Sequence, residues 1–277
     1  MNLENITIGS AIWEKDYTTI LGTNYFELLY HSDIQCNRLL VVNNVNNNEK
    51  VKSLLTSKDL KKLNMDIIWE EENEEFVLSS FPGKKITKKS FEARTPIHLL
   101  LKSFLFKKNK LKKSYNGFWY SIGPLTAIAF CRTKYLLYFT GDAHIKKTED
   151  FNWIHKAISI MEKDNSIISA CPVWNNSYDY AKQESVGEID DFYVNNVFSD
   201  QCFLIDVEKV KSTTNFFNET NSSIKRIYPI YSTFKSFECR VCSYLRNHNM
   251  KRLVYKYSSY NHEDFTDEVI KYYQNLH

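Results

Sequence analysis

The sequence has little glycine and proline, and it lacks the glycine-rich loops that many nucleotide-binding proteins use. Its 277 residues include 7 glycines and 5 prolines, and neither G-x-x-x-x-G-K-[ST] nor G-x-G-x-x-G occurs. Because those motifs present backbone N–H groups to phosphates, their absence argues against a P-loop NTPase and a dinucleotide-dependent dehydrogenase. No segment rich in proline, glycine and serine divides the chain, so we expect one domain over residues 1–277.

The chain also lacks a strong net charge and a long apolar run. Its formal charge is +3, which demands no polyanionic partner. No recognition motif accompanies the lysines, so nucleic acid is not expected as a partner. No apolar run reaches the roughly 18 residues of a membrane-spanning helix. The N-terminal segment MNLENITIGS has neither the basic nor the apolar part of a signal peptide, which favours a cytoplasmic location.

The cysteines lack the spacing of a zinc site. They are Cys36, Cys131, Cys171, Cys202, Cys239 and Cys242. Only the last two form C-x-x-C, and a structural zinc site would need a second pair or histidines at matching spacing. We therefore expect ordinary core cysteines, with the reduced thiols of a cytoplasmic protein.

Strand-like and helix-like segments alternate in the first half of the chain. We expect strands at 5–13, 38–45, 65–69 and 135–139, helices at 25–31, 51–63 and 123–134, and a loop over the acidic run 70–75. Pro124 would then lie in the first turn of its helix, where its missing donor costs nothing. The alternation predicts an α/β fold with a mostly parallel central sheet and helices on both faces.

The second half is less regular. It contains helix candidates at 151–163 and 236–247, strand candidates at 166–173 and 252–257, and a polar tail that begins SSYNHED. We expect this irregular half to build a variable pocket beside the sheet.

The stretch YLLYFTGDAHI, residues 135–145, places two potential metal ligands at the end of an apolar strand. In α/β sheets, ligands bind outside the carboxyl ends of the strands. Asp142 and His144 therefore lie where a ligand site is expected. The alternative is a polar turn that ends the strand, with Gly141 supplying the turn geometry.

Together with the helix before it, this region (GPLTAIAFCRTKYLLYFTGDAH) resembles GT-A fold glycosyltransferases, in particular the large inverting, family-2-like group that includes many bacterial polysaccharide enzymes. In that family the strand ends in an Asp-x-Asp motif, whose divalent metal bridges the donor's diphosphate. Here the first aspartate position is Thr140, so the motif is either reduced to Asp142 or shifted to Asp142-x-His144. The resemblance implies Mn²⁺ or Mg²⁺, and an imidazole ligand favours manganese.

The same resemblance implies site residues in the second half. NNVFSDQCFLID, residues 195–206, is similar to the segment where inverting members place their general base. Asp200 is the first candidate for this base and Glu238 the second, because the base must take a proton from the acceptor hydroxyl. Asp200 could equally be a helix N-cap or part of a surface turn. His262 is implied as a further metal ligand from near the C-terminus, with a surface histidine as the alternative.

Donor recognition in the family comes from the ends of the first strands. The resemblance implies that the base and ribose are held by two pairs of residues: Ser10 and Trp13 after the first strand, and Asn43 and Asn44 after the second. Trp13 could equally be a core aromatic. Arg94 could approach the diphosphate. It lies in the basic stretch 84–113, which could alternatively dock on an anionic membrane surface or form a solvated face.

Taken together, these residues imply a metal-dependent glycosyltransferase. It would move a sugar from a nucleotide-diphosphate-sugar donor to a hydroxyl of a glycan or lipid-linked glycan, with inversion. Residues 1–145 would form the nucleotide-sugar-binding half and residues 146–277 the acceptor-binding half of a cytoplasmic protein that could contact the inner face of a membrane.

Two alternatives stay open. One is a nucleotidyltransferase that makes sugar nucleotides, although SAIWEKDY lacks the glycine-rich basic loop of those enzymes; the other is a non-catalytic glycan-binding protein with a degenerate site.

Overall fold

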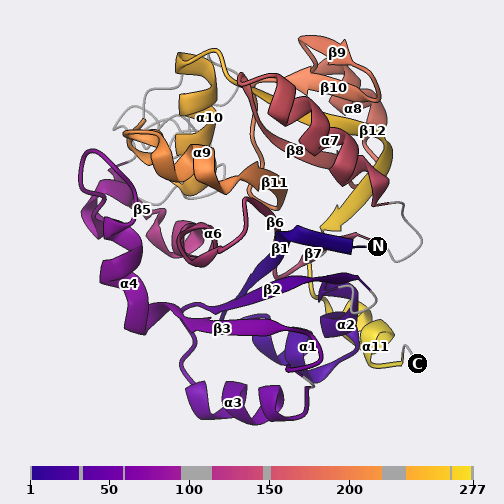
Figure 1. Cartoon of the computed structure of the whole chain (residues 1–277). Coiled ribbons are helices and arrows are strands. Elements are labelled where there is room, and N and C mark those ends of the chain that lie inside the picture. The colour runs from indigo at the N-terminus through magenta and orange to yellow at the C-terminus, as the bar shows by residue number, and fades with distance from the viewer. Residues whose placement is uncertain are drawn as a thin grey trace, which may run out of the picture.

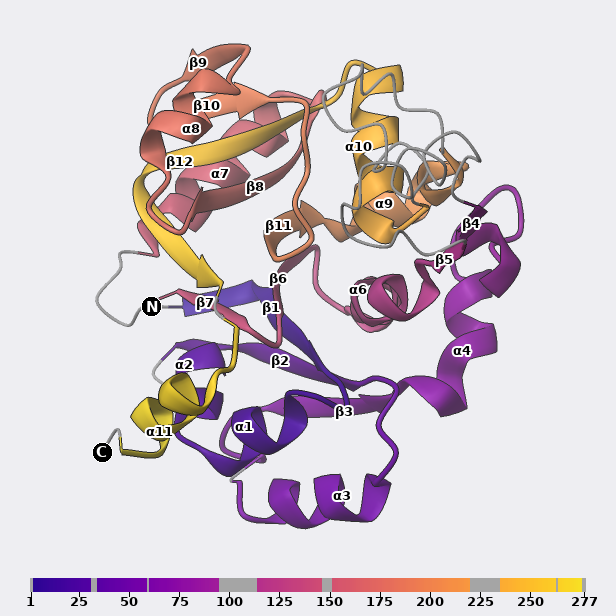
Figure 2. The same ribbon diagram turned by 180° about the vertical axis from the view of Figure 1, so that it is seen from behind.

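The computed structural model describes residues 2–30, 34–58, 60–94, 114–145, 151–219, 235–262 and 264–275. Within these ranges a large central sheet carries helices on both faces, as Figures 1 and 2 show from opposite sides. The expected α/β class is therefore confirmed. The strands of the sheet fall into two groups that pair differently, and the candidate site lies where the groups meet.

The first group is parallel throughout. It comprises β3 (Met65–Trp69), β2 (Gln35–Val42), β1 (Asn2–Ile12) and β6 (Tyr135–Thr140), paired in that order. Ile6, Ile8 and Ile12 of β1 are buried, as expected for β-branched residues on a pleated surface. Because the four strands run in one direction, their carboxyl ends meet at one edge of the sheet.

The second group contains mostly antiparallel pairs. It comprises β11 (Cys202–Asp206), β8 (Ile167–Trp174), β12 (Lys251–His262), β10 (Phe192–Asn195) and β9 (Gly187–Ile189), while the short strand β7 (Ala143–Ile145) pairs with β12. The groups join where β11 pairs antiparallel with β6. Only β8 and β12 run parallel here. A separate ribbon links β4 (Glu92–Arg94) and β5 (Ser114–Asn116).

Alternate residues of the strands feed two core layers. Tyr135, Leu137 and Phe139 of β6 belong to the layer under α1 (Tyr17–Gly22), α2 (Tyr25–Tyr30), α3 (Asn48–Thr56) and α7 (Asn152–Lys163). Leu136 and Tyr138 belong to the layer under α4 (Glu70–Ser79), α6 (Phe118–Phe130), α9 (Val207–Ser212) and α10 (Phe237–Asn247). This period of two is the signature of a strand buried on both faces. The other helices of the described residues are α8 (Tyr178–Gln183), α11 (Asp267–Asn275), η1 (Lys88–Phe91) and η2 (Phe216–Asn218).

Three sequence expectations need correction. The acidic run 70–75 is not a loop but begins α4, where Glu70, Glu71 and Glu72 occupy the first turn; negative charge there is favoured by the helix dipole. Helix α6 begins at Phe118 rather than at 123, which puts Pro124 in the helix interior. The strand expected at 252–257 is longer, because β12 runs from Lys251 to His262 and includes the first residues of the polar tail.

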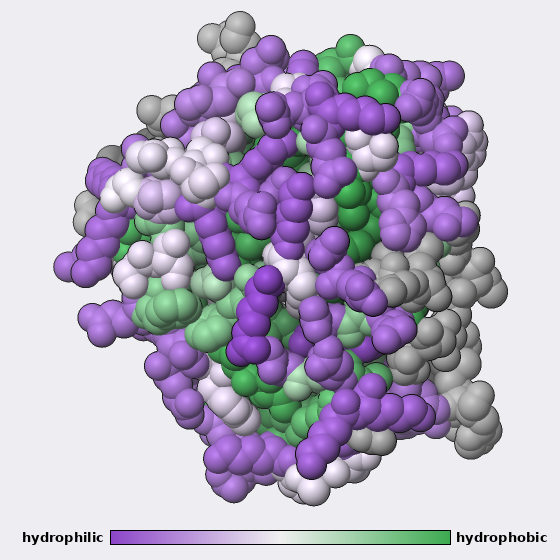
Figure 3. Space-filling view, in the orientation of Figure 1, coloured by the Kyte–Doolittle hydropathy of each residue, from purple (hydrophilic) through white to green (hydrophobic). Residues whose placement is uncertain are grey.

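The surface is largely polar. Figure 3 shows hydrophilic residues over most of one face, with hydrophobic residues visible between them. None of the helices in the described parts of the chain is long and apolar enough to cross a membrane.

Candidate functional site

A cleft of about 270 Å³ lies at the carboxyl ends of the parallel strands. The described residues that line it are Ala11, Ile12, Trp13, Asp16, Asn43, Trp119, Tyr120, Gly123, Pro124, Tyr138, Thr140, Gly141, Asp142, Asp200, Gln201 and His262. Three neighbouring strands end here, since β1 stops at Ile12, β2 at Val42 and β6 at Thr140. The position is the one at which sheets of this class bind ligands.

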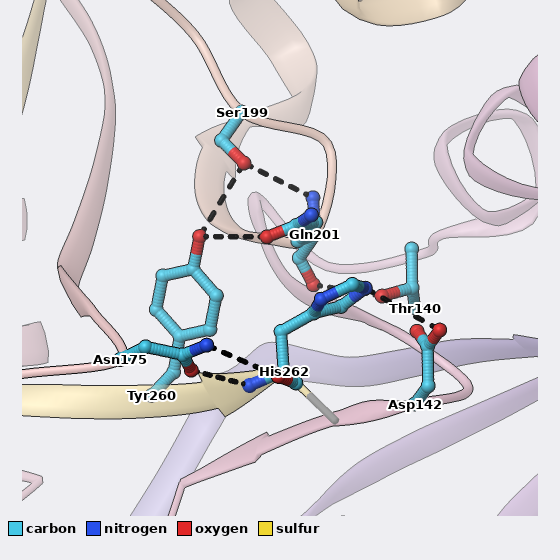
Figure 4. A network of polar contacts seen from close by, with 7 residues as sticks. All are labelled: Thr140, Asp142, Asn175, Ser199, Gln201, Tyr260 and His262. Atoms are coloured by element: carbon cyan, nitrogen blue, oxygen red, sulfur yellow. Dashed lines mark hydrogen bonds and ion pairs between the residues drawn. The ribbon is translucent and has the colours of Figure 1, made fainter. Parts of the chain in front are cut away.

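Asp142 and His262 meet in this cleft although they are 120 residues apart in the sequence. After β6 the chain turns at Gly141 and Asp142 into β7, which pairs with β12 so that Ala143 lies opposite His262. The His262 Nε2 atom is 3.3 Å from the Asp142 Oδ2 atom. Asn175 fixes the backbone of His262, accepting from its N–H at 2.7 Å and donating to its carbonyl at 3.1 Å (Figure 4).

The two side chains stabilise each other's charged form. Burial raises the pKa of Asp142, but contact with His262 outweighs this effect and leaves the pKa below its usual value. The same contact raises the pKa of His262 above 6.5, against the effect of its own burial. Asp142 is therefore a carboxylate at neutral pH, and its oxygens are available to a cation or a hydrogen-bond donor.

Asp16 adds a second acidic group at the floor of the cleft. Its Oδ1 atom accepts the backbone N–H of Trp13 at 2.7 Å, and burial raises its pKa well above 3.8. Gly141 is needed beside it, since a Cβ atom at Gly141 would lie 2.7 Å from the Asp16 Oδ2 atom and 2.9 Å from the Ala11 carbonyl oxygen. Any larger residue at 141 would push into the site.

Aromatic rings also line the cleft. The ring centroids of Trp13 and Tyr120 are 6.2 Å apart, and Trp119 and Tyr120 keep 40% and 57% of their surface exposed. Asn43 lines it too, and its Nδ2 atom donates to the Trp119 carbonyl at 3.0 Å. A flat ring could stack on these rings while the acidic residues receive a polar group.

Asp200 and Gln201 border the cleft on the side of the antiparallel strands. Burial and, to a smaller extent, the charge of Asp142 raise the pKa of Asp200 to about 6. The Gln201 carbonyl accepts the backbone N–H of Thr140 at 2.9 Å, which fixes this segment against the end of β6. Gln201 also lines a second pocket of about 250 Å³, which contains Glu238. Burial and, to a smaller extent, the charge of Asp200 raise the pKa of Glu238 to about 8.

The structure brings some of the sequence-predicted residues together and separates others. Trp13, Asn43, Asp142, Asp200 and His262 line the first cleft, and Glu238 lines the second pocket. Four further candidates are not among the described lining residues of either: Ser10, Asn44, Arg94 and His144.

Each of the four has an identifiable environment. Ser10 is fully buried within β1. His144 is buried in β7, where its ring packs edge-on against Tyr25 at a centroid distance of 5.3 Å, so Asp142 and His144 do not point to one site. Asn44 adopts a positive φ of 48° in the turn after β2. The side chain of Arg94 and residues 95–113 of the basic stretch lie outside the described residues.

The donor set fits a metal that is shared with a bound diphosphate. Asp142 supplies a carboxylate oxygen and His262 an imidazole nitrogen beside it. Among the residues that the structure describes, no group of three or more His, Cys, Asp or Glu could hold a metal by itself. Mg²⁺ and Mn²⁺ are commonly held by one or two carboxylates plus substrate phosphates, so a partial protein shell is the chemistry expected for them.

Sequence reasoning missed Asp16, Trp119, Tyr120 and Gln201. Asp16 follows β1 by four residues, so the rule that ligands gather at strand ends could have found it. Trp119 and Tyr120 were placed before a helix rather than in its first turn, because the start of α6 was predicted five residues late.

No family model matches the sequence, and no curated protein sequence matches it. Several solved glycosyltransferase structures resemble the fold. The galactosyltransferase LgtC, solved with donor and acceptor sugar analogs, aligns over 87% of this chain and 70% of its own, with 10% identity and a TM-score of 0.40. GalNAc-T7 with UDP, GalNAc and Mn²⁺ aligns over 94% of this chain, with 12% identity and a TM-score of 0.45. TarS from S. aureus with UDP-GlcNAc aligns over 97%, with 12% identity and a TM-score of 0.43. The chain spans 44% of the GalNAc-T7 chain and 61% of the TarS chain.

Proposed function

We propose that the protein is a metal-dependent glycosyltransferase that moves a sugar from a nucleotide-diphosphate-sugar donor to a hydroxyl of a glycan or lipid-linked glycan, with inversion. The observation that carries the proposal is the composition of the first cleft. Its lining combines the two kinds of group that such a donor needs, aromatic rings from Trp13, Trp119 and Tyr120 and the Asp142–His262 pair.

The aromatic rings would hold the nucleotide. Trp13 and Tyr120 offer ring faces for the base, and Asn43 offers a side-chain amide for hydrogen bonds to the base or ribose. The partial exposure of Trp119 and Tyr120 leaves room for a base to enter from solvent. Stacking on aromatic rings is tolerant of base identity, so hydrogen bonds from Asn43 and neighbouring backbone groups would set the preference.

The acidic residues would receive the diphosphate. Asp142 and His262 would hold a divalent metal, preferably Mn²⁺ because one ligand is an imidazole. When bound, the metal supplies positive charge that neutralises the departing diphosphate. To act as a ligand, His262 must give up the proton that favours its contact with Asp142.

Asp200 is the proposed general base. In the transfer step the acceptor oxygen forms a bond to the anomeric carbon of the donor sugar, the bond from that carbon to the diphosphate oxygen breaks, and Asp200 takes the hydroxyl proton. A carboxylate with a pKa of about 6 is ionised at neutral pH and is a stronger base than an ordinary aspartate. Glu238, with a pKa of about 8, is mainly protonated at neutral pH and is the weaker candidate.

The test is the thermal unfolding midpoint in the presence of a panel of nucleoside diphosphates with Mn²⁺, Mg²⁺ or EDTA. At a ligand concentration of about 100 times Kd, the midpoint should rise by roughly 5 °C with one nucleotide, and only with metal. Asp142→Ala should abolish the rise. The control is Asp66→Ala, which removes an exposed aspartate outside the cleft. No rise with any nucleotide would refute the donor site and leave the glycan-binding alternative ahead.

The cytoplasmic location and the contact with an anionic membrane through the basic stretch belong to the same proposal. A vesicle flotation assay with and without anionic lipid would test the membrane contact, since electrostatic docking requires the anionic lipid.

A further inference from the structure

The second pocket contains a buried arginine whose charge lacks a close carboxylate. Arg252 lies in β12 between β8 and β10, and 7% of its surface is exposed. Its Nε atom donates to the Asn195 Oδ1 atom at 3.3 Å. Among the described residues, no carboxylate oxygen lies within 4.0 Å of the guanidinium. A buried charge of this kind is costly unless a partner satisfies it.

The other buried arginines of the described chain have a different environment. Arg38 donates to the backbone carbonyls of Tyr30, Cys36, Leu63 and Ile34, so its donors are used within the protein. Arg240 likewise donates to the carbonyls of Lys235, Phe217 and Ser90. Neither lines a described pocket, whereas Arg252 lines the pocket of about 250 Å³. Arg252 is therefore placed to bind something that enters from outside.

The acidic residues of the pocket do not neutralise Arg252 at close range. Glu238 and Glu184 both line the pocket, and both interact with Arg252 over a longer distance. Because burial raises the pKa of Glu238 to about 8, this side chain is mainly a neutral carboxylic acid at pH 7 and can donate a hydrogen bond. Glu184 accepts from the Tyr180 hydroxyl at 2.7 Å.

The pocket adjoins the proposed reaction centre. Gln201 lines both the pocket and the first cleft, and the neighbouring Asp200 lines the cleft. Figure 4 shows Tyr260, which lines the pocket, beside Gln201, and Gln201 beside Thr140, which lines the cleft. The Tyr260 hydroxyl is 3.4 Å from the Gln201 Oε1 atom. At the rim of the pocket, Trp174 and Tyr180 keep 45% and 55% of their surface exposed and offer ring faces to a sugar.

We propose that this pocket binds the acceptor sugar and selects one that carries an anionic substituent, a carboxylate or a phosphate, which Arg252 recognises. The planar guanidinium matches either group through paired hydrogen bonds. The sugar ring would lie against Trp174 and Tyr180, with a hydroxyl directed past Gln201 to Asp200. This assignment rests on the proposed function, since a transferase needs an acceptor site next to its base.

The first experiment needs no variant. Methyl β-D-glucuronide, glucose 6-phosphate and methyl β-D-glucoside are titrated into the wild-type protein by calorimetry. The acidic probes should bind at least about tenfold more tightly than the neutral glucoside, because hydrogen bonds to a charged group are stronger than neutral ones. A preference between the two acids identifies the anionic group. Equal binding of acidic and neutral probes overturns the proposal.

The second experiment uses Arg252→Gln, with Arg132→Gln as its matched control. Arg132 has a side chain that is 82% exposed and lies outside both pockets. Arg252→Gln should weaken binding of the acidic probe by about tenfold and leave the neutral probe unchanged, while Arg252→Lys should lose less because it keeps the charge. Unchanged affinity for the acidic probe in folded Arg252→Gln overturns the proposal.

Titrations repeated with excess UDP separate this proposal from the function it rests on. If UDP abolishes binding of the acidic probe, the anion binds in the first cleft and the assignment to the second pocket is overturned. If nucleotides bind and no acidic preference exists, only the acceptor assignment fails. If no nucleotide binds but the acidic preference depends on Arg252, the transferase function fails and the anionic-sugar pocket stands.

Discussion

The two neighbouring cavities have similar volumes, about 270 and 250 Å³, but differ in the charged residues that line them. The first collects Asp16, Asp142 and Asp200 around one histidine, so it can accept a diphosphate only together with a cation. The second has one cation, Arg252, and two glutamates, Glu184 and Glu238, of which Glu238 is mainly neutral at pH 7.

The difference follows from how each cavity is built. The first lies at the ends of parallel strands, where the carboxyl ends of β1, β2 and β6 converge. The second lies on strands of the mostly antiparallel group. There β10 pairs with β12, so that Asn195 lies opposite Arg252. A sheet with two pairing modes can thus place two differently charged cavities next to each other, with Gln201 lining both.

The largest expected effect comes from removing the carboxylate of Asp200, which lines the first cleft next to Gln201. Asp200→Asn should lower the transfer rate by about 10²–10⁴-fold, because the acceptor hydroxyl loses its base. Nucleotide binding in the first cleft and acidic-sugar binding in the second pocket should both persist. Steady-state kinetics and calorimetry on the same variant check these outcomes.

The wild-type pH profile provides an independent readout of the same residue. With a pKa of about 6, Asp200 is protonated and inactive below that pH, so kcat should rise with pH and level off above it. A rate that does not change across that interval, or an Asn variant with normal turnover, would remove Asp200 as the base.

A second substitution should damage only the first cleft. In Gly141→Ala the new Cβ atom would lie 2.7 Å from the Asp16 Oδ2 atom, so we expect a loss of about 1–3 kcal/mol in unfolding free energy and weaker nucleotide binding. Gly22→Ala is the matched control, since no atom lies within 4 Å of its added Cβ; it should change stability by no more than about 1 kcal/mol. Denaturant titration distinguishes them, and equal effects would contradict the close approach at Gly141.

A third substitution tests the acid of the second pocket. Glu238→Gln replaces a mainly protonated acid by a neutral group of similar shape, so transfer at neutral pH should fall by less than about threefold. A loss as large as that of Asp200→Asn would make Glu238 the base.

The stability of Glu238→Gln should also depend on pH. The pKa of Glu238 is raised from 4.5 to about 8 on folding, so its contribution to wild-type stability is present below about pH 4.5 and is lost as the pH rises through 8. The unfolding midpoint of the Gln variant should therefore gain on that of the wild type as the pH increases. A difference that does not vary with pH would contradict the raised pKa.

The smallest effect concerns the Asp142–His262 pair in the protein without ligand. Because folding raises the pKa of His262, its contribution to stability is fully present below about pH 6.5 and is lost as the pH rises through the folded-state pKa. Because folding lowers the pKa of Asp142, its contribution is present above about pH 3.8. His262→Ala should thus lower the free energy of unfolding more near pH 5.5 than near pH 8.5, and the difference should be about 1 kcal/mol or less. His155→Ala is the control, because it removes an exposed histidine outside the cleft; an equal pH dependence in both variants would contradict the role of the pair.

Much of the first cleft could be predicted from the sequence because its residues follow apolar strands. Trp13, Asn43 and Asp142 come directly after strands that the hydrophobic pattern identifies, and parallel strands bring their ends together. His144 shows where this reasoning stops. It follows Asp142 by two residues, but β7 turns away to pair with β12, and the ring packs against Tyr25 instead of facing the cleft.

The second pocket was less accessible to sequence reasoning. Glu238 was named as an alternative base, but nothing local marks Arg252, which lies in a strand pattern like any other. Its environment depends on the pairing of β12 with β8 and β10 and on the approach of α10, contacts between residues far apart in the chain. Helix α4 illustrates the same limit at a smaller scale, since its run of glutamates has the composition of a loop until the helix dipole is considered.

The most direct test of the central claim is a crystal of the protein grown with Mn²⁺ and the nucleoside diphosphate that stabilises it most, measured with anomalous scattering from manganese. The account predicts an anomalous peak between the Asp142 carboxylate and the His262 imidazole, with the diphosphate on its far side and the base between Trp13 and Tyr120. A nucleotide bound elsewhere, or manganese without contact to Asp142, would contradict it.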